Sequence, residues 1–217
     1  MTDVRPEPVG GRPEFRPQPV GLPPELVEGP TAVVVGAGLI GASVGCALTA
    51  AGYSVHLQDR QISHARVAAG LGAGTVEPAQ PDRVDLVVVA VRPDAIAGVV
   101  AESLETFPRA TVTDVGSVKA GVLDALWRRA VDLARYVGSH PMAGSQHSGP
   151  LTARADLFAD RTWVVTPHRR SEAAAVARVQ AAVRACGARP VVMDVDDHDA
   201  AVARADRDGM ADAPRVG

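Results

Sequence analysis

The sequence lacks long apolar runs and lacks any strong charge of one sign. No stretch reaches the 18 or more apolar residues that predict a membrane span, so we expect no transmembrane helix. The formal net charge is −3 at pH 7. Nucleic-acid-binding domains usually carry a marked positive excess, so this charge gives no reason to expect a nucleic-acid partner.

Cysteine is also scarce. The only two cysteines, Cys46 and Cys186, lie far apart within predicted helices. This spacing is typical of buried, reduced thiols in a cytoplasmic protein, and it predicts neither a disulfide framework nor a metal site.

The first 30 residues contain eight prolines with charged residues between them and no apolar segment of the signal-peptide type. We expect residues 1–30 to be a disordered, proline-rich leader and the folded domain to begin near Thr31.

From Thr31 the chain alternates between short apolar segments and longer helical patterns. We expect helices at 62–70, 94–106, 119–130 and 171–186, and a further helix after the glycine motif described below. The predicted strands are 33–35, 54–58, 85–91, 111–113, 135–137, 162–166 and 188–193. This alternation predicts an α/β domain over residues 31–195, with a Rossmann-type, doubly wound and mostly parallel sheet.

A glycine motif follows the first predicted strand. Gly36, Gly38 and Gly41 have the G-x-G-x-x-G spacing. In a dinucleotide-binding turn the first glycine allows the sharp bend, the second lets backbone amides approach a pyrophosphate, and the third lets the helix pack closely. Leu39 and Ile40 begin that helix, whose N-terminus favours an anion. A tight turn without a ligand is the alternative interpretation.

Asp59 stands 23 residues after Gly36, at the end of the second predicted strand. A carboxylate there accepts hydrogen bonds from a ribose and repels a 2′-phosphate, which favours NAD over NADP. Arg60 leaves NADP open, because an arginine can bind the 2′-phosphate. Val91 and Arg92 follow the third strand and are expected beside the cofactor.

Two polar loops follow the fourth and fifth predicted strands, at the sheet edge where ligands of such folds bind. Ser117 lies in the first loop. His140 and Ser145 lie in the second, and His140 is expected two residues beyond the strand end, where its imidazole could act as a base. Lys119 is the only lysine in the chain. It could be a residue of the site or a solvent-facing residue at the start of a helix, and the sequence leaves both interpretations open. The simplest interpretation of His56, His64, His147 and His168 is a surface or structural role.

These motifs resemble a known family. The segments VVVGAGLIGASVGCAL, DLVVVAVRP, TDVGSVKAGV, GSHPMAGSQHSGP and MDVDDHDAAVA, spread over residues 31–203, are similar to the nucleotide-binding domain of prephenate or arogenate dehydrogenases. The resemblance implies NAD-dependent oxidative decarboxylation of prephenate to 4-hydroxyphenylpyruvate in tyrosine biosynthesis. It implies His140 as the base, Ser117 as the residue that orients either His140 or the substrate's 4-hydroxyl beside the cofactor, Ser145 on the substrate side, and no metal.

Two departures from the family pattern follow. Gln146 stands where many members carry an acid. Members continue into a helical domain that forms a homodimer and binds substrate, whereas residues 196–217 are interpreted as a truncated start of that domain with an aberrant tail. Three interpretations therefore remain: a prephenate or arogenate dehydrogenase, an NAD-binding remnant without turnover, or another Rossmann dehydrogenase acting on a hydroxy acid or an acyl thioester, which the SHPMAGS segment disfavours.

Overall fold

The computed structural model describes residues 29–143 and 149–211. Residues 1–28 of the predicted leader and the predicted substrate residue Ser145 lie outside these ranges. The elements in chain order are β1 (Thr31–Val35), α1 (Leu39–Ala50), β2 (Ser54–Gln58), α2 (Ile62–Gly70), η1 (Pro81–Arg83), β3 (Leu86–Val89), η2 (Pro93–Ala95), α3 (Ile96–Thr106), β4 (Thr111–Asp114), α4 (Ala120–Arg128), β5 (Gly138–Pro141), η3 (Pro150–Thr152), β6 (Thr162–Thr166), α5 (Ala173–Ala185), β7 (Arg189–Val192) and α6 (Val195–Ala211).

Four parallel strands form the first sheet, in the order β2-β1-β3-β4. The chain runs from β1 to β2 on one side and then crosses to β3 on the other side of β1. The strand order therefore reverses between β1 and β3, which is the switch point where ligands bind in doubly wound folds. The predicted Rossmann-type architecture is confirmed.

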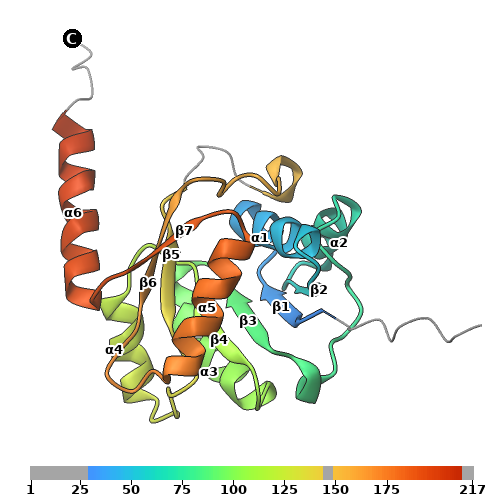
Figure 1. The fold of residues 1–217 in the computed structure, drawn as a ribbon, viewed down its shortest axis with the longest axis horizontal. Coiled ribbons are helices and arrows are strands. Elements are labelled where there is room, and N and C mark those ends of the chain that lie inside the picture. The colour runs from blue at the N-terminus through green and yellow to red at the C-terminus, as the bar shows by residue number, and fades with distance from the viewer. Residues whose placement is uncertain (1–28, 144–148, 212–217) are drawn as a thin grey trace, which may run out of the picture.

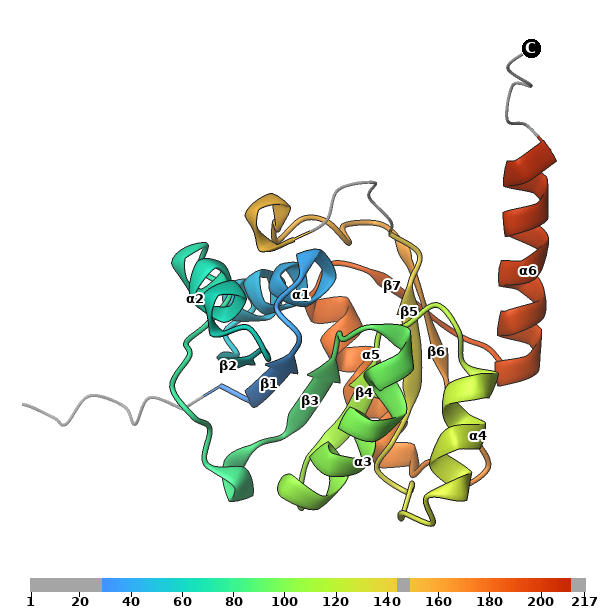
Figure 2. The same cartoon turned by 180° about the vertical axis from the view of Figure 1, so that it is seen from behind.

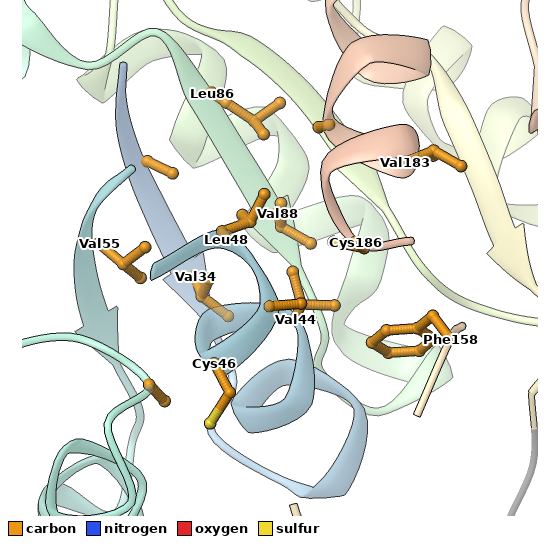
Figure 3. Packing of buried hydrophobic residues seen from close by; sticks show 14 of the residues in the cluster. Val34, Val44, Cys46, Leu48, Val55, Leu86, Val88, Phe158, Val183 and Cys186 are labelled. Carbon is orange, nitrogen blue, oxygen red and sulfur yellow. The ribbon is translucent and has the colours of Figure 1, made fainter. Parts of the chain in front are cut away.

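The strands alternate their side chains between two cores. Val34 and Val88 face the core that α1 and α5 cover, whereas Val33 and Val87 face the core that α3 and α4 cover. Figures 1 and 2 show these helix layers on opposite faces of the sheet, and Figure 3 shows the first core. Because both faces are buried, β3 is apolar throughout and β1 is apolar from Ala32 to Val35, as is typical of parallel strands.

The second sheet departs from the prediction. It contains three strands in the order β5-β6-β7, and β5 runs antiparallel to β6. The strand predicted at 135–137 makes one parallel bridge, from Tyr136 to Val112, and the chain then continues into β5. His140 thus lies within a strand and not two residues beyond one. The prediction was wrong because the sequence Gly-Ser-His-Pro pairs through its backbone and needs no apolar side chains.

Both cysteines are buried and unpaired. In the described part of the chain no helix has the length and apolar character that crossing a bilayer requires. Helix α6 extends from the end of β7 and stands apart from the two sheets along most of its length (Figures 1 and 2). Its first turns contact α4 and β6, and this contact completes the site described next.

Candidate active site

The glycine turn, residues 36–41, joins β1 to α1 at the switch point. Gly36 has a φ of +99°, and a Cβ there would overlap the backbone of Ala90 at the end of β3. A Cβ on Gly41 would overlap the carbonyl oxygen of Gly36, so this glycine is needed for close packing of α1 on the turn. The protein itself therefore explains two of the three glycines.

Gly38 has no such explanation within the protein. A Cβ there would meet no atom of the described residues within 4 Å, and its φ of −74° is accessible to any residue. Gly38 is the N-cap of α1, no side chain in the described part of the chain caps this helix, and its first turn contains no acid. The open space beside a free helix N-terminus fits a phosphate group, because unpaired amides and the helix dipole both favour an anion.

Asp59 lies against this turn. One carboxylate oxygen accepts a hydrogen bond from the Ala37 amide at 2.7 Å, and the other accepts from the Gln61 amide at 2.7 Å. The side chain is only 14% exposed. Each carboxylate oxygen has a further lone pair, so Asp59 is both a support for the turn and an available acceptor.

The other residues predicted around the cofactor occupy different environments. Leu39 is buried and Ile40 is partly buried, so both contribute to packing at the start of α1. Arg60 is exposed. Arg92 is also exposed and pairs with Asp94 at 3.5 Å, whereas Val91 packs against the core under α3 and α4.

A buried ion pair lies at the end of β4. Lys119 is 2% exposed, and its ammonium group donates to the Asp114 carboxylate and to the Ser139 carbonyl oxygen. Asp114 also accepts from the Tyr136 hydroxyl at 2.8 Å and from the Gly116 amide at 2.9 Å. We call Asp114, Lys119, Tyr136 and Ser139 the lysine cluster. Of the two possibilities for Lys119, the solvent-facing helix start is excluded.

The lysine cluster fixes the strand that carries His140. Ser139 precedes His140, and its hydroxyl donates to the Asp114 carbonyl oxygen at 2.8 Å and accepts from the Trp163 indole at 3.0 Å. Burial of Tyr136, and then the neighbouring Asp114 carboxylate, raise the pKa of the Tyr136 phenol well above its ordinary value. The phenol therefore remains a hydrogen-bond donor at neutral pH.

His140 is half-buried and contacts a second histidine from α6. The two rings lie 5.2 Å apart at an angle of 78°, and His140 Nδ1 is 3.0 Å from His198 Nε2. Burial lowers the pKa of His140 from 6.5 to about 4, and the neighbouring His198 and Lys119 add to this effect against the opposing Asp114 and Asp199. The imidazole is therefore neutral at pH 7.

Asp199 completes this arrangement, which we call the histidine pair with its carboxylate. Its Oδ1 lies 2.8 Å from His198 Nδ1 and accepts from the Lys119 amide at 3.0 Å. Its Oδ2 accepts from the Ala120 amide at 2.9 Å and thereby caps α4. The sequence analysis did not assign a role to His198 or Asp199; the available signal was an acid beside a histidine at a helix start.

Ser117 lies on the short turn between Gly116 and the capped start of α4, and its side chain is exposed. The turn is held at one end by the hydrogen bond from the Gly116 amide to Asp114. At the other end the amides of Lys119 and Ala120 donate to Asp199. Among the described residues, the side chain that hydrogen-bonds the His140 ring is His198 and not Ser117. The predicted orienting role of Ser117 stays a prediction.

A family model described as the nucleotide-binding domain of prephenate dehydrogenase matches residues 44–192. The chain belongs to the prephenate dehydrogenase family. The match begins inside α1 and does not include the glycine turn. A dinucleotide-binding role for that turn is therefore supported by its geometry and not by the family match.

Individual comparisons agree with the family match. NovF of Streptomyces niveus, described as a probable prephenate dehydrogenase, is 43% identical over 173 residues, which cover 80% of this chain and 48% of NovF. The prephenate dehydrogenase of Bacillus subtilis is 29% identical and is covered to the same extent, 48%. The chain therefore spans about half the length of these curated relatives.

A solved structure shows the same fold. The arogenate dehydrogenase of Synechocystis superposes with a TM-score of 0.72 at 24% identity, covering 86% of this chain and 71% of that protein. At this identity the likeness supports the Rossmann-type fold alone.

Proposed function

We propose that this chain is the NAD-binding and catalytic-base part of a dehydrogenase that converts prephenate to 4-hydroxyphenylpyruvate. The observation that carries the proposal is the neutral His140 imidazole, held in a strand that is fixed to Asp114 at the end of β4. A neutral imidazole is the form that can accept a proton near pH 7. The family match and the relatives' names supply the substrate class.

NAD is the cofactor that the residues fit best. The open Gly38 position and the uncapped start of α1 would take the pyrophosphate, and Asp59 would accept from the adenosine ribose. The Asp59 carboxylate would also repel a 2′-phosphate, so NADP is expected to bind less well than NAD. When bound, the nicotinamide supplies the acceptor for the hydride that leaves C4 of the substrate ring.

The task of His140 is a proton transfer. As C4 loses hydride and its oxygen gains carbonyl character, the C4 hydroxyl would pass its proton to the imidazole. Loss of the C1 carboxylate as carbon dioxide leaves its electron pair to complete the aromatic ring, and the proton returns to what is now a phenol oxygen. Ser117 is proposed to hold the same hydroxyl. Ser145, outside the described residues, is proposed to line the substrate side.

The cofactor half of the proposal is tested by a matched pair of glycine variants. NAD⁺ titrations by calorimetry should show binding to the unchanged chain, and Gly38→Ala should weaken it by about tenfold or more, because a methyl group would occupy the pyrophosphate space. Gly38→Ala should not lower stability, since the protein leaves this position open. Gly70→Ala, at a second open position outside the site, is the control and should leave NAD⁺ affinity unchanged.

The catalytic half is tested by turnover. The purified chain is mixed with NAD⁺ and prephenate, or with NAD⁺ and arogenate, and reduced nicotinamide is followed by absorbance. His140→Asn should lower any turnover by about 10²–10⁴-fold while NAD⁺ affinity is retained. Binding of NAD⁺ without turnover on either substrate would favour the alternative of an NAD-binding domain alone, and absence of NAD⁺ binding would refute both.

A further inference from the structure

We propose that His198 and Asp199, at the start of α6, are positioning residues that select the tautomer of His140 in which Nε2 is the proton acceptor. The inference rests on the proposed function, because it concerns how His140 serves as a base. It adds a role for α6, an element that contributes nothing to the glycine turn.

The side chains of Asp199, His198 and His140 form a chain of two consecutive hydrogen-bonding contacts. Asp199 Oδ1 lies 2.8 Å from His198 Nδ1, and His198 Nε2 lies 3.0 Å from His140 Nδ1. His198, the middle residue, is only 1% exposed, so water has little access to replace its contact with Asp199 or with His140. Hydrogen bonds of this kind fix which ring nitrogen carries the proton.

The direction of these hydrogen bonds follows from the carboxylate. An ionised carboxylate can only accept, so His198 Nδ1 must carry the proton and donate to Asp199. In a neutral His198 the other nitrogen, Nε2, then has only a lone pair and must accept. His140 Nδ1 is left as the donor, and the lone pair of His140 falls on Nε2.

Asp199 is held in the ionised form that this direction of hydrogen bonding requires. Burial by itself raises the pKa of Asp199, but hydrogen bonds from the Ala120 amide, the His198 ring and the Lys119 amide outweigh it and lower the pKa. The same carboxylate therefore caps α4 and orients His198. In Ser-His-Asp triads a carboxylate fixes the tautomer of the catalytic histidine by direct contact; here Asp199, whose side chain is 26% exposed, acts on His140 through His198.

Four charged or titratable groups influence the proton affinity of His140. His198 and the Lys119 ammonium oppose protonation, and the carboxylates of Asp114 and Asp199 favour it. Of the two carboxylates, Asp199 is the one connected to the ring through His198. When Nε2 takes the substrate proton, the positive charge on His140 would be stabilised through that connection.

The test measures the tautomer directly and does not depend on turnover. In a chain labelled with ¹⁵N-histidine, correlations between ring protons and ring nitrogens at pH 7 should show His140 with Nδ1 protonated and Nε2 unprotonated. The opposite tautomer in the unchanged chain would overturn the proposal, whatever the variants do.

Asp199→Asn is the informative variant, with Asp197→Asn as its matched control. If the asparagine turns its NH2 group toward His198 Nδ1 and keeps its oxygen on the Ala120 amide, the proton moves to His198 Nε2 and His140 Nδ1 becomes an acceptor. His140 should then shift toward the Nε2-protonated tautomer. Asp197 is an exposed acid in the same helical turn, so its substitution removes the same charge and should leave the tautomer unchanged. An unchanged tautomer both in Asp199→Asn and in Asp199→Ala, whose side chain cannot accept from His198 Nδ1, would refute the proposal.

Kinetics separate this inference from the proposed function. With NAD⁺ and the substrate that is turned over, Asp199→Asn should lower kcat by about 10²–10⁴-fold with little change in KM for NAD⁺. If His140→Asn leaves turnover intact, the proposed base is wrong even where the tautomer is as expected. If His140→Asn is inactive but Asp199→Asn retains full kcat, the positioning role is wrong and the base stands.

Discussion

The glycine turn and the histidine pair show two ways of building a functional site. The turn takes its residues from one continuous βαβ unit, and Asp59, the proposed ribose acceptor, accepts a hydrogen bond from the Ala37 amide, 22 positions earlier. The histidine pair joins residues 58 positions apart, and its carboxylate hydrogen-bonds to an amide 80 positions away. The first region depends on local backbone geometry, whereas the second depends on how α6 docks against α4 and β5.

The lysine cluster, which fixes the strand that carries His140, also joins residues far apart in the sequence. One substitution in this cluster should have the largest effect on stability. Lys119→Met would leave the buried Asp114 carboxylate without its ammonium partner, and an uncompensated buried charge costs about 3–5 kcal/mol. We expect urea unfolding to show a loss of this size. Arg189→Met, which breaks an exposed ion pair with Asp160, is the control and should cost about 1 kcal/mol or less.

A double variant makes the Lys119 prediction stricter. In Lys119→Met combined with Asp114→Asn, neither charge is buried, while the side-chain oxygen of the introduced asparagine can still accept from the Tyr136 hydroxyl. Stability should then recover in part relative to Lys119→Met alone. If the double variant is less stable than the single one, the buried pair is not the source of the loss.

Substitutions in the glycine turn should lower stability less than Lys119→Met does. The loss is expected at Gly41, where a Cβ would overlap the backbone, and not at Gly38, where the described residues leave space. Gly41→Ala would push a methyl group into the Gly36 carbonyl oxygen, and overpacking of this kind costs about 1–3 kcal/mol. Gly98→Ala in α3 is the control, because its Cβ has room and alanine favours a helix interior, so stability should rise by up to about 1 kcal/mol. Equal effects at Gly41 and Gly98 in thermal unfolding would contradict the packing argument.

The sequence was informative where a site is local. The spacing of Gly36, Gly38 and Gly41 was enough to predict the turn, because each step of a strand-turn-helix unit constrains the next. The family resemblance pointed to Ser117 and His140. Apolar periodicity also located the strands and helices of the parallel sheet, because both faces of that sheet must be covered.

The same reasoning stopped where a contact depends on tertiary structure. A lone lysine at a helix start carries no sign that it will be buried against Asp114, since the sequence does not reveal what packs over it. The strand at His140 was missed because its sequence, Gly-Ser-His-Pro, has neither an apolar run nor an alternation of apolar and polar residues. His198 was visible as part of a motif, but its partner became apparent only once α6 was placed beside β5.

The smallest expected effect is a pH dependence of stability that arises from His140 in the histidine pair. The pKa of His140 in the folded chain is about 4, below the ordinary 6.5 expected on unfolding. As the pH falls, His140 is therefore protonated in the unfolded chain before it is protonated in the folded chain. The contribution of His140 to stability is present above pH 6.5 and is lost progressively as the pH falls toward 4. At pH 6 the loss attributable to His140 should be at most roughly 1 kcal/mol relative to pH 7.5, because solvent around the half-buried ring screens part of the effect.

Urea unfolding at both pH values should show this extra loss in the unchanged chain and in His64→Gln, but not in His140→Asn. His64 is the matched control, because its side chain is 42% exposed and lies outside the histidine pair. An equal loss in His140→Asn would mean that His140 is not held neutral by its surroundings, and the contrast between the two regions would then rest on packing alone.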